Sequence, residues 1–406
     1  MKKQLLFLLT LINFLAFGQQ VVADLTFEPG TGFDQAVHDI IVQPDGKIIA
    51  CGYFLNFNGT NVNQIARLNP NGSLDLSFNS GSGFGYFGYP GILPYVNSML
   101  LQSDGKVIVT GDFTSYNGIN VNQIARLNSN GTLDLTFNSG SGFGGGTSSS
   151  LYSMSIQNDG KIVGVGDFSN YNGINANNIV RLNPNGSIDN SFNPGSGFNQ
   201  NVKDIIIQPD GKLIVLGDFT SYNGVTVNRV VRLTANGSLD PTFNCYVFVN
   251  NETISLTSLQ SDGKILVSYY SYNGNYSSKI IRLNSDGSQD ASFEIIGNGF
   301  NEAILSSCVQ SNGKIIVGGA FTNFNGTITN RIARFNADGT LDLTFEVGSG
   351  FSGAVRNILI QQDERILVSG WLNTFNNSNY TNGITRLKEC NSTVLLTRRV
   401  NIDILY

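Results

Sequence analysis

The sequence predicts an all-β protein, a seven-bladed β-propeller built of four-stranded antiparallel blades. Three observations predict this fold. A turn motif, Asp-Gly-Lys or a variant of it, occurs seven times at spacings of 50 to 59 residues, and a period near 50 is typical of propellers and solenoids. The segments between the turns are short, rich in β-branched and aromatic residues, and show no helical period. A second motif, Asp-x-Ser/Thr-Phe, also occurs seven times.

Residues 1–18 predict a secretory signal peptide. Lys2 and Lys3 precede an apolar run at 5–17, and small residues follow it. The run is too short to span a bilayer comfortably, and no later stretch is long and apolar enough to do so. Cleavage after Gly18 would leave a seven-repeat propeller over 19–394 and a short C-terminal tail over 395–406. We therefore expect the protein to be secreted or held at the cell surface.

One repeat, residues 38–78, illustrates how each predicted strand arises. Strands are expected at 38–43, 47–54, 63–69 and 73–78. The first two are joined by Gln-Pro-Asp-Gly-Lys and the last two by Asn-Pro-Asn-Gly-Ser. Both sequences predict tight hairpins, with a type I turn followed by a glycine in the left-handed conformation. These hairpins should share one face of the ring, and the longer connections should lie on the opposite face.

The second hairpin predicts a cross-strand ion pair, because its register places an arginine opposite the aspartate eight residues later. We expect these pairs to help fix register, and each is worth about 0.2–1 kcal/mol if it is partly exposed. An alternative function, a ring of arginines for an acidic ligand, is less favoured because each arginine has its own aspartate. The pairs are Arg67/Asp75, Arg126/Asp134, Arg181/Asp189, Arg232/Asp240, Arg282/Asp290 and Arg334/Asp342.

The last repeat lacks the aspartate of this pattern, and a matching aspartate is present near the start of the mature chain. Arg386 has no aspartate eight residues later and no Asn-Gly turn, whereas Asp24 opens an Asp-x-Thr-Phe motif that precedes any repeat. An open array would leave an unpaired strand at each end. We therefore predict that 24–27 is the outer strand of the last repeat, that Asp24 pairs with Arg386, and that the ring is closed.

The repeated pattern, with its turn, its arginine and its Leu-Asp-x-Thr-Phe phrase in fixed order, resembles the delta-60 repeat family of bacterial β-propellers over about residues 20–394. The resemblance implies a secreted or surface protein and carries no catalytic residues. Members are often found in gliding bacteria with a C-terminal sorting domain. The present sequence ends in Asn-Ile-Asp-Ile-Leu-Tyr, in which no such domain is recognisable.

Composition excludes several classes of function. The net charge is −5 with no basic block, which argues against nucleic-acid binding. There is one histidine, which removes most histidine-based metal and triad chemistry. Cys51 and Cys308 replace apolar residues in predicted strands and are interpreted as buried thiols. Cys245 and Cys390 cannot be paired from the sequence.

The long connection over 79–95 is the predicted ligand-binding segment. It carries four aromatic residues among glycines: Tyr86, Phe87, Tyr89 and Tyr95. Exposed rings on such a loop can stack on sugars or grip a peptide. The alternative is that they fold back as a hydrophobic lid over the ring.

A weaker hypothesis concerns calcium. Three successive repeats carry an aspartate at one level, Asp112, Asp167 and Asp218, and three convergent carboxylates could hold Ca²⁺. The alternative is that each carboxylate bonds to the amides of its own loop. No other cofactor is expected.

The leading functional hypothesis is a non-catalytic binding scaffold for a glycan or a protein, acting as a monomer. One alternative is an exported propeller enzyme of the lyase, lactonase or glycosidase type. Such enzymes need clustered histidines or paired carboxylates, and the seven glutamates of this sequence do not recur in the repeats. The other alternative is a purely structural module of a surface assembly.

Overall fold

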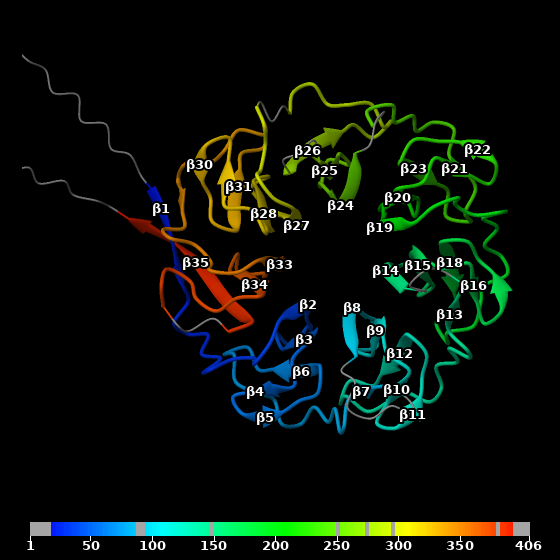
Figure 1. Cartoon of the computed structure of the whole chain (residues 1–406), viewed down its shortest axis with the longest axis horizontal. Helices are drawn as coiled ribbons and strands as arrows, with labels where there is room; N and C mark the ends of the chain where they lie inside the picture. The colour runs from blue at the N-terminus through cyan, green and yellow to red at the C-terminus, as the bar shows by residue number, and fades with distance from the viewer. Residues whose placement is uncertain are drawn as a thin grey trace, which may run out of the picture.

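The computed structural model describes residues 18–86, 94–145, 150–248, 252–272, 276–293, 297–378 and 382–392, and contains no helix in these ranges. Six three-stranded sheets and one five-stranded sheet are arranged radially around a central opening (Figure 1). The all-β propeller architecture is as expected. Within the same ranges no helix is long and apolar enough to cross a membrane.

Each radial sheet contains an inner strand beside the opening, a middle strand and a third strand. The inner strands are β2 (Val37–Val42), β8 (Tyr95–Leu101), β14 (Ser150–Ile156), β19 (Val202–Ile207), β24 (Thr253–Leu259), β27 (Ile304–Val309) and β33 (Val355–Ile360). The middle strands are β3 (Ile48–Gly52), β9 (Val107–Asp112), β15 (Ile162–Asp167), β20 (Leu213–Gly217), β25 (Ile265–Tyr272), β28 (Ile315–Gly319) and β34 (Ile366–Gly370). The third strands are β6 (Ile65–Leu68), β12 (Ile124–Leu127), β18 (Ile179–Leu182), β23 (Val230–Leu233), β26 (Tyr276–Leu283), β31 (Ile332–Phe335) and β35 (Ile384–Ser392).

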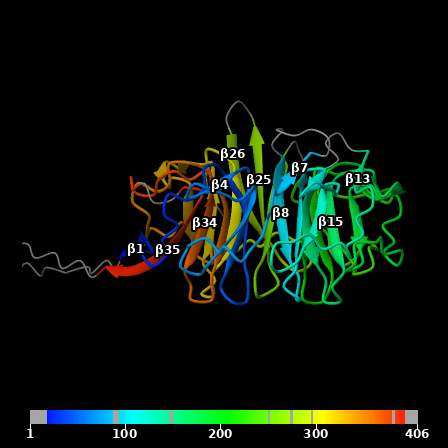
Figure 2. The ribbon, with the colours of Figure 1, turned by 90° about the horizontal axis from the view of Figure 1, so that it is seen from below.

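Thirteen strands of the described chain have two residues each. They are β4 (Asn56–Phe57), β5 (Thr60–Asn61), β7 (Phe84–Gly85), β10 (Ser115–Tyr116), β11 (Ile119–Asn120), β13 (Phe143–Gly144), β16 (Asn170–Tyr171), β17 (Ile174–Asn175), β21 (Ser221–Tyr222), β22 (Val225–Thr226), β29 (Asn323–Phe324), β30 (Thr327–Ile328) and β32 (Phe345–Glu346). Twelve of them belong to small antiparallel pairs or sheets at the periphery, where the sequence predicted only loops, and the last of them, β32, pairs parallel with β1 (Gly18–Ala23). Figure 2 shows β7 and β13 near the face that carries the long connections.

The tight hairpins have the left-handed glycines that their sequences predict. Gly46 and Gly72 have φ values of 81° and 88°, a conformation that glycine adopts without the steric cost of a Cβ. In the first turn, Gly46 donates its N–H to the Gln43 carbonyl at 2.9 Å, and Gln43 donates to Lys47 at 2.8 Å. Each hairpin therefore sets the register of the two strands that it joins.

The core lies between neighbouring sheets rather than within one of them. The middle strands are buried on both faces, as β3 and β20 illustrate. One buried cluster contains Ile49 and Cys51 of the first repeat together with Val96 and Val107 of the second. Each sheet thus depends on its neighbours for burial of apolar surface, and an isolated repeat would leave both faces exposed.

The prediction of four-stranded blades is wrong for the outermost strand. The segment 73–78 makes a single bridge, Leu68 to Leu74, and then turns. The cause is Asp75, whose Oδ1 accepts hydrogen bonds from the N–H and the hydroxyl of Ser77 at 3.0 and 2.6 Å. This local bonding by an aspartate curls the backbone and competes with a β-ladder.

A buried ion pair joins arginine and aspartate at the spacing of eight, and it recurs in every repeat. Arginine Nε lies 2.7–2.8 Å from aspartate Oδ2 in all seven pairs, Asp24/Arg386 included. These side chains are at most 9% exposed. The pairs are therefore buried, because the neighbouring sheet covers them, and the energy expected for a partly exposed pair does not apply to them.

Each guanidinium also connects its repeat to the next. In six repeats Nη1 donates to a backbone carbonyl of the following hairpin: Ser129, Pro184, Ala235, Ser285, Ala337 or Pro70. The guanidinium carbon also lies 4.5–5.1 Å from the centre of the ring of the phenylalanine that closes the repeat, a cation–π arrangement. One side chain thereby fixes the turn, the closing ring and the next sheet.

A lysine of the Asp-Gly-Lys turn reaches the same carboxylate, at 2.7–3.1 Å in six repeats. Burial works to raise the pKa of Asp189, but hydrogen bonds from Ser191, Lys161 and Arg181 outweigh it and hold that pKa well below the usual value. The ionised form is therefore the folded form, and the pairs lose their contribution only as the pH falls below about 4.

Ring closure joins the two ends of the described chain. Strand β1 (Gly18–Ala23) pairs antiparallel with β35 and parallel with β32, so that it lies between them. The Asp24 N–H then donates to the Arg386 carbonyl at 2.8 Å. The predicted contact between Asp24 and Arg386 is thus present, but the prediction that 24–27 forms the outer strand is wrong. Residues 25 and 26 form a turn, in which Thr26 donates to the Asp24 carboxylate, and β1, directly before Asp24, makes the ladder with β35.

Glu389 replaces a missing turn in the last repeat. It stands three residues after Arg386, the spacing that separates Pro70 from Arg67. Because β35 continues as a strand here, no turn carbonyl faces the preceding sheet. The Oε1 atom of Glu389 instead accepts hydrogen bonds from Arg334 Nη1 and from Gln310 Nε2. A side-chain oxygen thereby completes the contact that backbone carbonyls make elsewhere.

The four cysteines are free thiols in the structure. Cys51 is buried, as predicted, and Cys308 is half-buried in β27. Burial raises the pKa of the Cys308 thiol to about 12, so that it stays protonated and packs as a small apolar group.

We predict that deletion of residues 19–27 lowers the thermal midpoint by more than Ile188→Ala does. The deletion removes the ladder of β1 and leaves β35 with an unpaired edge, whereas Ile188 makes one bridge of an intact repeat. Circular dichroism melting of both variants measures the difference. A deletion variant with the midpoint of the full chain would contradict ring closure as a source of stability.

We predict that Arg181→Ala destabilises the fold by about 3–5 kcal/mol, because it leaves Asp189 buried without its main partner. The matched control is Lys161→Ala, which removes a 26%-exposed side chain from the same carboxylate and should cost less than about 1 kcal/mol. Denaturant unfolding gives both values. Equal losses would show that the arginine acts only as one more surface charge.

Candidate functional site

Every inner strand contains a β-bulge at the equivalent place, after the first one or two paired residues of the strand. The ladder skips from Val37 to Asp39 in β2, and the other six inner strands skip one residue at the equivalent position. Bulges re-aim a side chain and recur beside functional sites. The seven bulge residues are His38, Asn97, Tyr152, Lys203, Ser255, Leu305 and Arg356.

The bulge residues differ from repeat to repeat, although the frame around them does not. The residue before each is a buried apolar side chain in all seven strands, such as Val37 or Val355. The bulge position, by contrast, holds cationic, aromatic, amide, hydroxyl and aliphatic groups. They stand on the strands nearest the central opening (Figure 1). We define these seven residues as the bulge ring.

Three side chains of the first, second and last repeats form one cluster in this region. The His38 ring lies 4.3 Å from the ring of Tyr95, and the Tyr95 hydroxyl lies 3.3 Å from Arg356 Nη1. His38 is 6% exposed, and its Nδ1 is 3.0 Å from the Val96 carbonyl. Nε2 of His38 is buried and has no hydrogen-bond partner in the protein.

This environment keeps His38 neutral. Burial is the main cause that lowers its pKa to about 4, the hydrogen bond to Val96 opposes the shift, and the charge of Arg356 adds to it. The neutral ring donates from Nδ1–H to the carbonyl and leaves Nε2 as an acceptor. The sequence suggested only a polar residue at a strand end, and the structure places it inside β2 and under Tyr95.

A second cluster lies on the third and fourth repeats. Lys203 Nζ is 4.9 Å from the centre of the Tyr152 ring and 3.4 Å from Asp218 Oδ2. The side chains of Lys203 and Asp218 are 29% and 27% exposed. A cation, an aromatic face and a carboxylate therefore meet at this part of the opening.

Below the bulge ring, polar groups bind neighbouring sheets to one another. Asp39 accepts hydrogen bonds from Met99 N–H at 2.7 Å and from Asn357 Nδ2, which links three repeats. Ser153 donates to Asp204 at 2.7 Å across another junction. These carboxylates are held by the fold, so that they stabilise the platform under the bulge ring.

The predicted aromatic loop is only partly placed. Phe87 and Tyr89 lie outside the described residues. Tyr86 is half-buried, and burial together with a hydrogen bond to the Asp112 carboxylate raises its pKa to about 12. Tyr95 belongs to β8 rather than to a loop, because it pairs with Asp112 of β9. It is 37% exposed.

The three predicted calcium ligands do not form a metal site. Among the described residues, no three or more His, Cys, Asp or Glu side chains gather closely enough to hold an ion. Asp218 forms an ion pair with Lys203, and Asp112 accepts a hydrogen bond from Tyr86. Asp167 is buried at the end of β15.

Sequence reasoning missed the bulge ring, although a signal for it exists. Each bulge residue stands seven positions before the first residue of the Asp-Gly-Lys-type turn, as His38 does before Asp45. Aligned at that position, the repeats show one variable residue between an apolar residue and a residue that is polar in six of the seven repeats. The signal is weak without the structure, because an alternating strand also exposes polar residues.

Comparisons with known proteins support the fold. The model of a family described as "Domain of unknown function (DUF5122) beta-propeller" matches residues 43–78, 102–137, 157–192, 208–243, 260–293 and 310–345. No curated protein matches the chain.

Several solved structures are similar in fold. Virginiamycin B lyase from Staphylococcus aureus, solved in a catalytically inactive form with quinupristin, has a TM-score of 0.52 and 16% identity, over 92% of this chain and 99% of that one. The extracellular domain of a protein described as a hybrid two component system from B. thetaiotaomicron has a TM-score of 0.50 and 12% identity, over 91% of this chain and 39% of the other. Puromycin hydrolase has a TM-score of 0.51 and 12% identity, over 84% and 53%. This chain therefore spans less than two thirds of the last two.

We predict that the single histidine stays neutral down to about pH 5 in the folded protein, because its pKa is about 4. Histidine-selective isotope labelling gives one imidazole signal, since the chain has one histidine. Its chemical shift should be constant between about pH 8 and pH 5.5. Tyr95→Ala should expose the ring and move the titration toward the unperturbed range. An unmodified protein that titrates near pH 6.5 would contradict the buried cluster.

Proposed function

The chain belongs to the family described as "Domain of unknown function (DUF5122) beta-propeller", and from this membership we propose a secreted or cell-surface, non-catalytic binding scaffold. In this proposal the chain folds as a closed seven-bladed ring over 19–394, acts as a monomer, and presents its ligand site at the bulge ring on the long-connection face. The resemblance to delta-60 repeats is confirmed at the level of a β-propeller repeat family.

The observation that carries the proposal is the contrast between frame and bulge. The arginine, the aspartate and the hairpin glycines recur because each repeat needs them to dock on the next. The bulge position does not need a particular side chain for docking, because Ser255 and Lys203 occupy it in neighbouring repeats. Residues that vary on a constant scaffold are the usual form of a recognition surface.

The chemistry of the bulge ring favours recognition over catalysis. His38 is neutral and carries its proton toward a backbone carbonyl. The carboxylate of Asp218 is paired with Lys203, and that of Asp39 accepts hydrogen bonds from the second and the last repeat. A glycosidase or lyase would need paired carboxylates or a free general base. Aromatic faces beside a cation and amides instead suit a glycan or a protein loop.

We predict that the double variant Tyr152→Ser, Lys203→Ser folds normally and loses the ligand. Serine is a fair replacement because Ser255 holds the equivalent bulge in the fifth repeat. A glycan array and immobilised peptide panel would first identify the bound class with the unmodified protein. Affinity for that ligand should then fall at least about tenfold in the variant, with an unchanged thermal midpoint.

Three outcomes would contradict this proposal. A variant that retains full affinity would place the ligand elsewhere. Broad absence of binding in both panels would favour the structural-module alternative. Conversion of a bound ligand into a new product, detected by chromatography after incubation with the protein, would favour the enzyme alternative.

A further inference from the structure

A cavity of about 180 Å³ lies where the last repeat meets the first, at the junction that ring closure creates. Its walls are residues 33–36 of the first repeat and residues 370–373 and 382–383 of the last. Trp371 forms part of the wall. The backbone N–H of Trp371 donates to the Ala354 carbonyl at 3.0 Å. This hydrogen bond holds the backbone of Trp371 close to the bulge residue Arg356.

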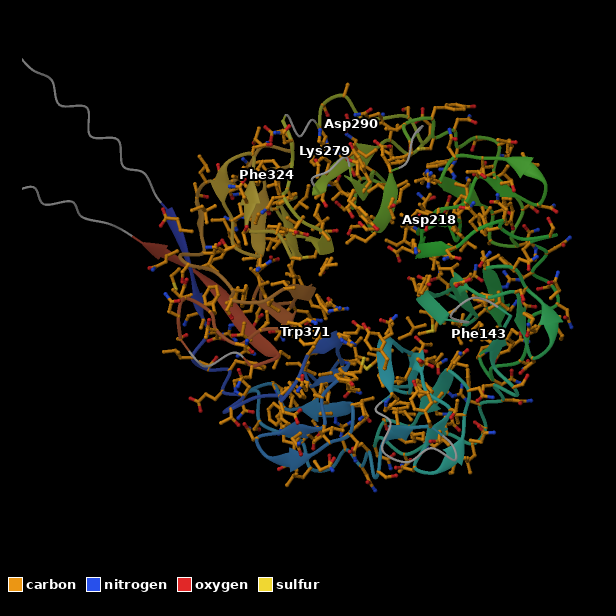
Figure 3. The ribbon with its side chains drawn as sticks, viewed as in Figure 1. Phe143, Asp218, Lys279, Asp290, Phe324 and Trp371 are labelled. Atoms are coloured by element: carbon orange, nitrogen blue, oxygen red, sulfur yellow. The ribbon has the colours of Figure 1, made fainter. Side chains whose placement is uncertain are left out.

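Trp371 is the only tryptophan of the chain, and it is 47% exposed. The equivalent residue, directly after the paired end of the middle strand, is Tyr53 in the first repeat and Ala320 in the sixth. The fold therefore does not need an indole at this position. Figure 3 places Trp371 beside the central opening, on the side opposite Asp218.

The polar wall of the cavity contains an exposed carboxylate, Asp34. Its Oδ1 accepts from the N–H groups of Leu55 and Asn56 at 2.9 and 3.0 Å, and its Oδ2 accepts from Asn56 Nδ2 at 2.8 Å. Asn199 and Asn301 make the same pair of backbone contacts with their amide oxygens in other repeats, and their amide nitrogens donate to a threonine. The negative charge and the two acceptor oxygens of Asp34 therefore distinguish this junction from those two repeats, and each carboxylate oxygen can accept a further hydrogen bond.

The other polar side chains of the wall are amides. Gln35 and Asn373 are exposed, and Asn382 is held by a hydrogen bond from its Nδ2 to the Thr31 carbonyl at 2.8 Å. The lining residues include no Lys, Arg or His. The cavity therefore offers an aromatic face, hydrogen-bond acceptors and amide donors, and it offers no cation for an anionic ligand.

We propose that this cavity binds one neutral hexopyranose residue of a glycan, with a C–H face of the sugar on the Trp371 indole and hydroxyl groups donating to Asp34. A pyranose has an apolar face and a polar edge, and the cavity presents the complementary pair of surfaces. The volume admits a single ring, so that longer chains would continue into solvent. A quaternary ammonium group is less suited, because it is usually enclosed by several aromatic rings. This inference rests on the proposed binding function and adds to it a sugar subsite that is separate from the bulge ring.

The test uses the lone tryptophan as its own reporter. The purified protein is titrated with glucose, galactose, mannose, N-acetylglucosamine and their linear oligomers, and with choline as the competing chemistry. At least one neutral sugar should shift the emission of Trp371 to shorter wavelength and protect it from acrylamide, because stacking removes water from the indole. Calorimetry should give the same affinity.

Three variants separate the site from the fold. Trp371→Ala should abolish the calorimetric signal, and Ala320 shows that the frame tolerates alanine there. Asp34→Asn should retain the hydrogen bonds from the N–H groups of Leu55 and Asn56, as Asn199 does, should lose the hydrogen bond from the Asn56 side chain, and should lose about tenfold in affinity. An unchanged thermal midpoint would show that the lost affinity does not come from unfolding. The control is Tyr246→Ala. Tyr246 is 73% exposed and lines a different pocket, so this variant should bind the sugar as the unmodified protein does.

The outcomes are distinguishable from failure of the proposed function. Glycan binding that survives Trp371→Ala unchanged would overturn this inference and leave the scaffold proposal intact. Choline binding in preference to every sugar would also overturn it. If neither these sugars nor the array ligands bind, both proposals fail together.

Discussion

The architecture depends on one buried ion pair, repeated around the ring. The aspartate needs the arginine because burial alone would raise its pKa, and the arginine needs the aspartate because a bare guanidinium under a neighbouring sheet would be costly. The remaining donors of the guanidinium face outward from the pair. They bind the next hairpin, and the closing phenylalanine covers the planar face. Register within one repeat and docking onto the next are therefore set by the same side chain.

A ring of such repeats would leave an unpaired strand at each end unless the first and the last strands pair with each other. The chain achieves this pairing by dividing its last sheet between its two ends, with β1 inserted between β35 and β32. The last repeat then lacks the hairpin that would supply a carbonyl to Arg334. Glu389 supplies a carboxylate oxygen in its place. The substitution preserves the hydrogen bond and adds a charge, so the junction departs from the repeat without weakening the contact.

The residues proposed to bind a ligand and the residues that hold the sheets together occupy different positions in the same strands. The buried residue at the entry of each inner strand packs between sheets, and the bulge that follows adds one residue that the ladder does not use. Such a position can change freely without disturbing the register. The residues at the closing junction can also differ from those at the other junctions, because they come from the first and the last repeat. Trp371 and Asp34 stand on either side of that junction.

The sequence by itself determined the propeller class, the hairpin turns, the seven ion pairs and the closure of the ring. These follow from periodic, local chemistry: a glycine that must be left-handed, or an arginine eight residues from its aspartate. Only the tertiary structure decided which groups are buried and which repeats meet. It showed that Asp75 curls the expected fourth strand into a turn, that the ion pairs are covered, and that Tyr95 stacks on His38. It also brought residues 34 and 371 to one cavity. Burial and long-range contact depend on the docking of neighbouring sheets, which no single repeat encodes.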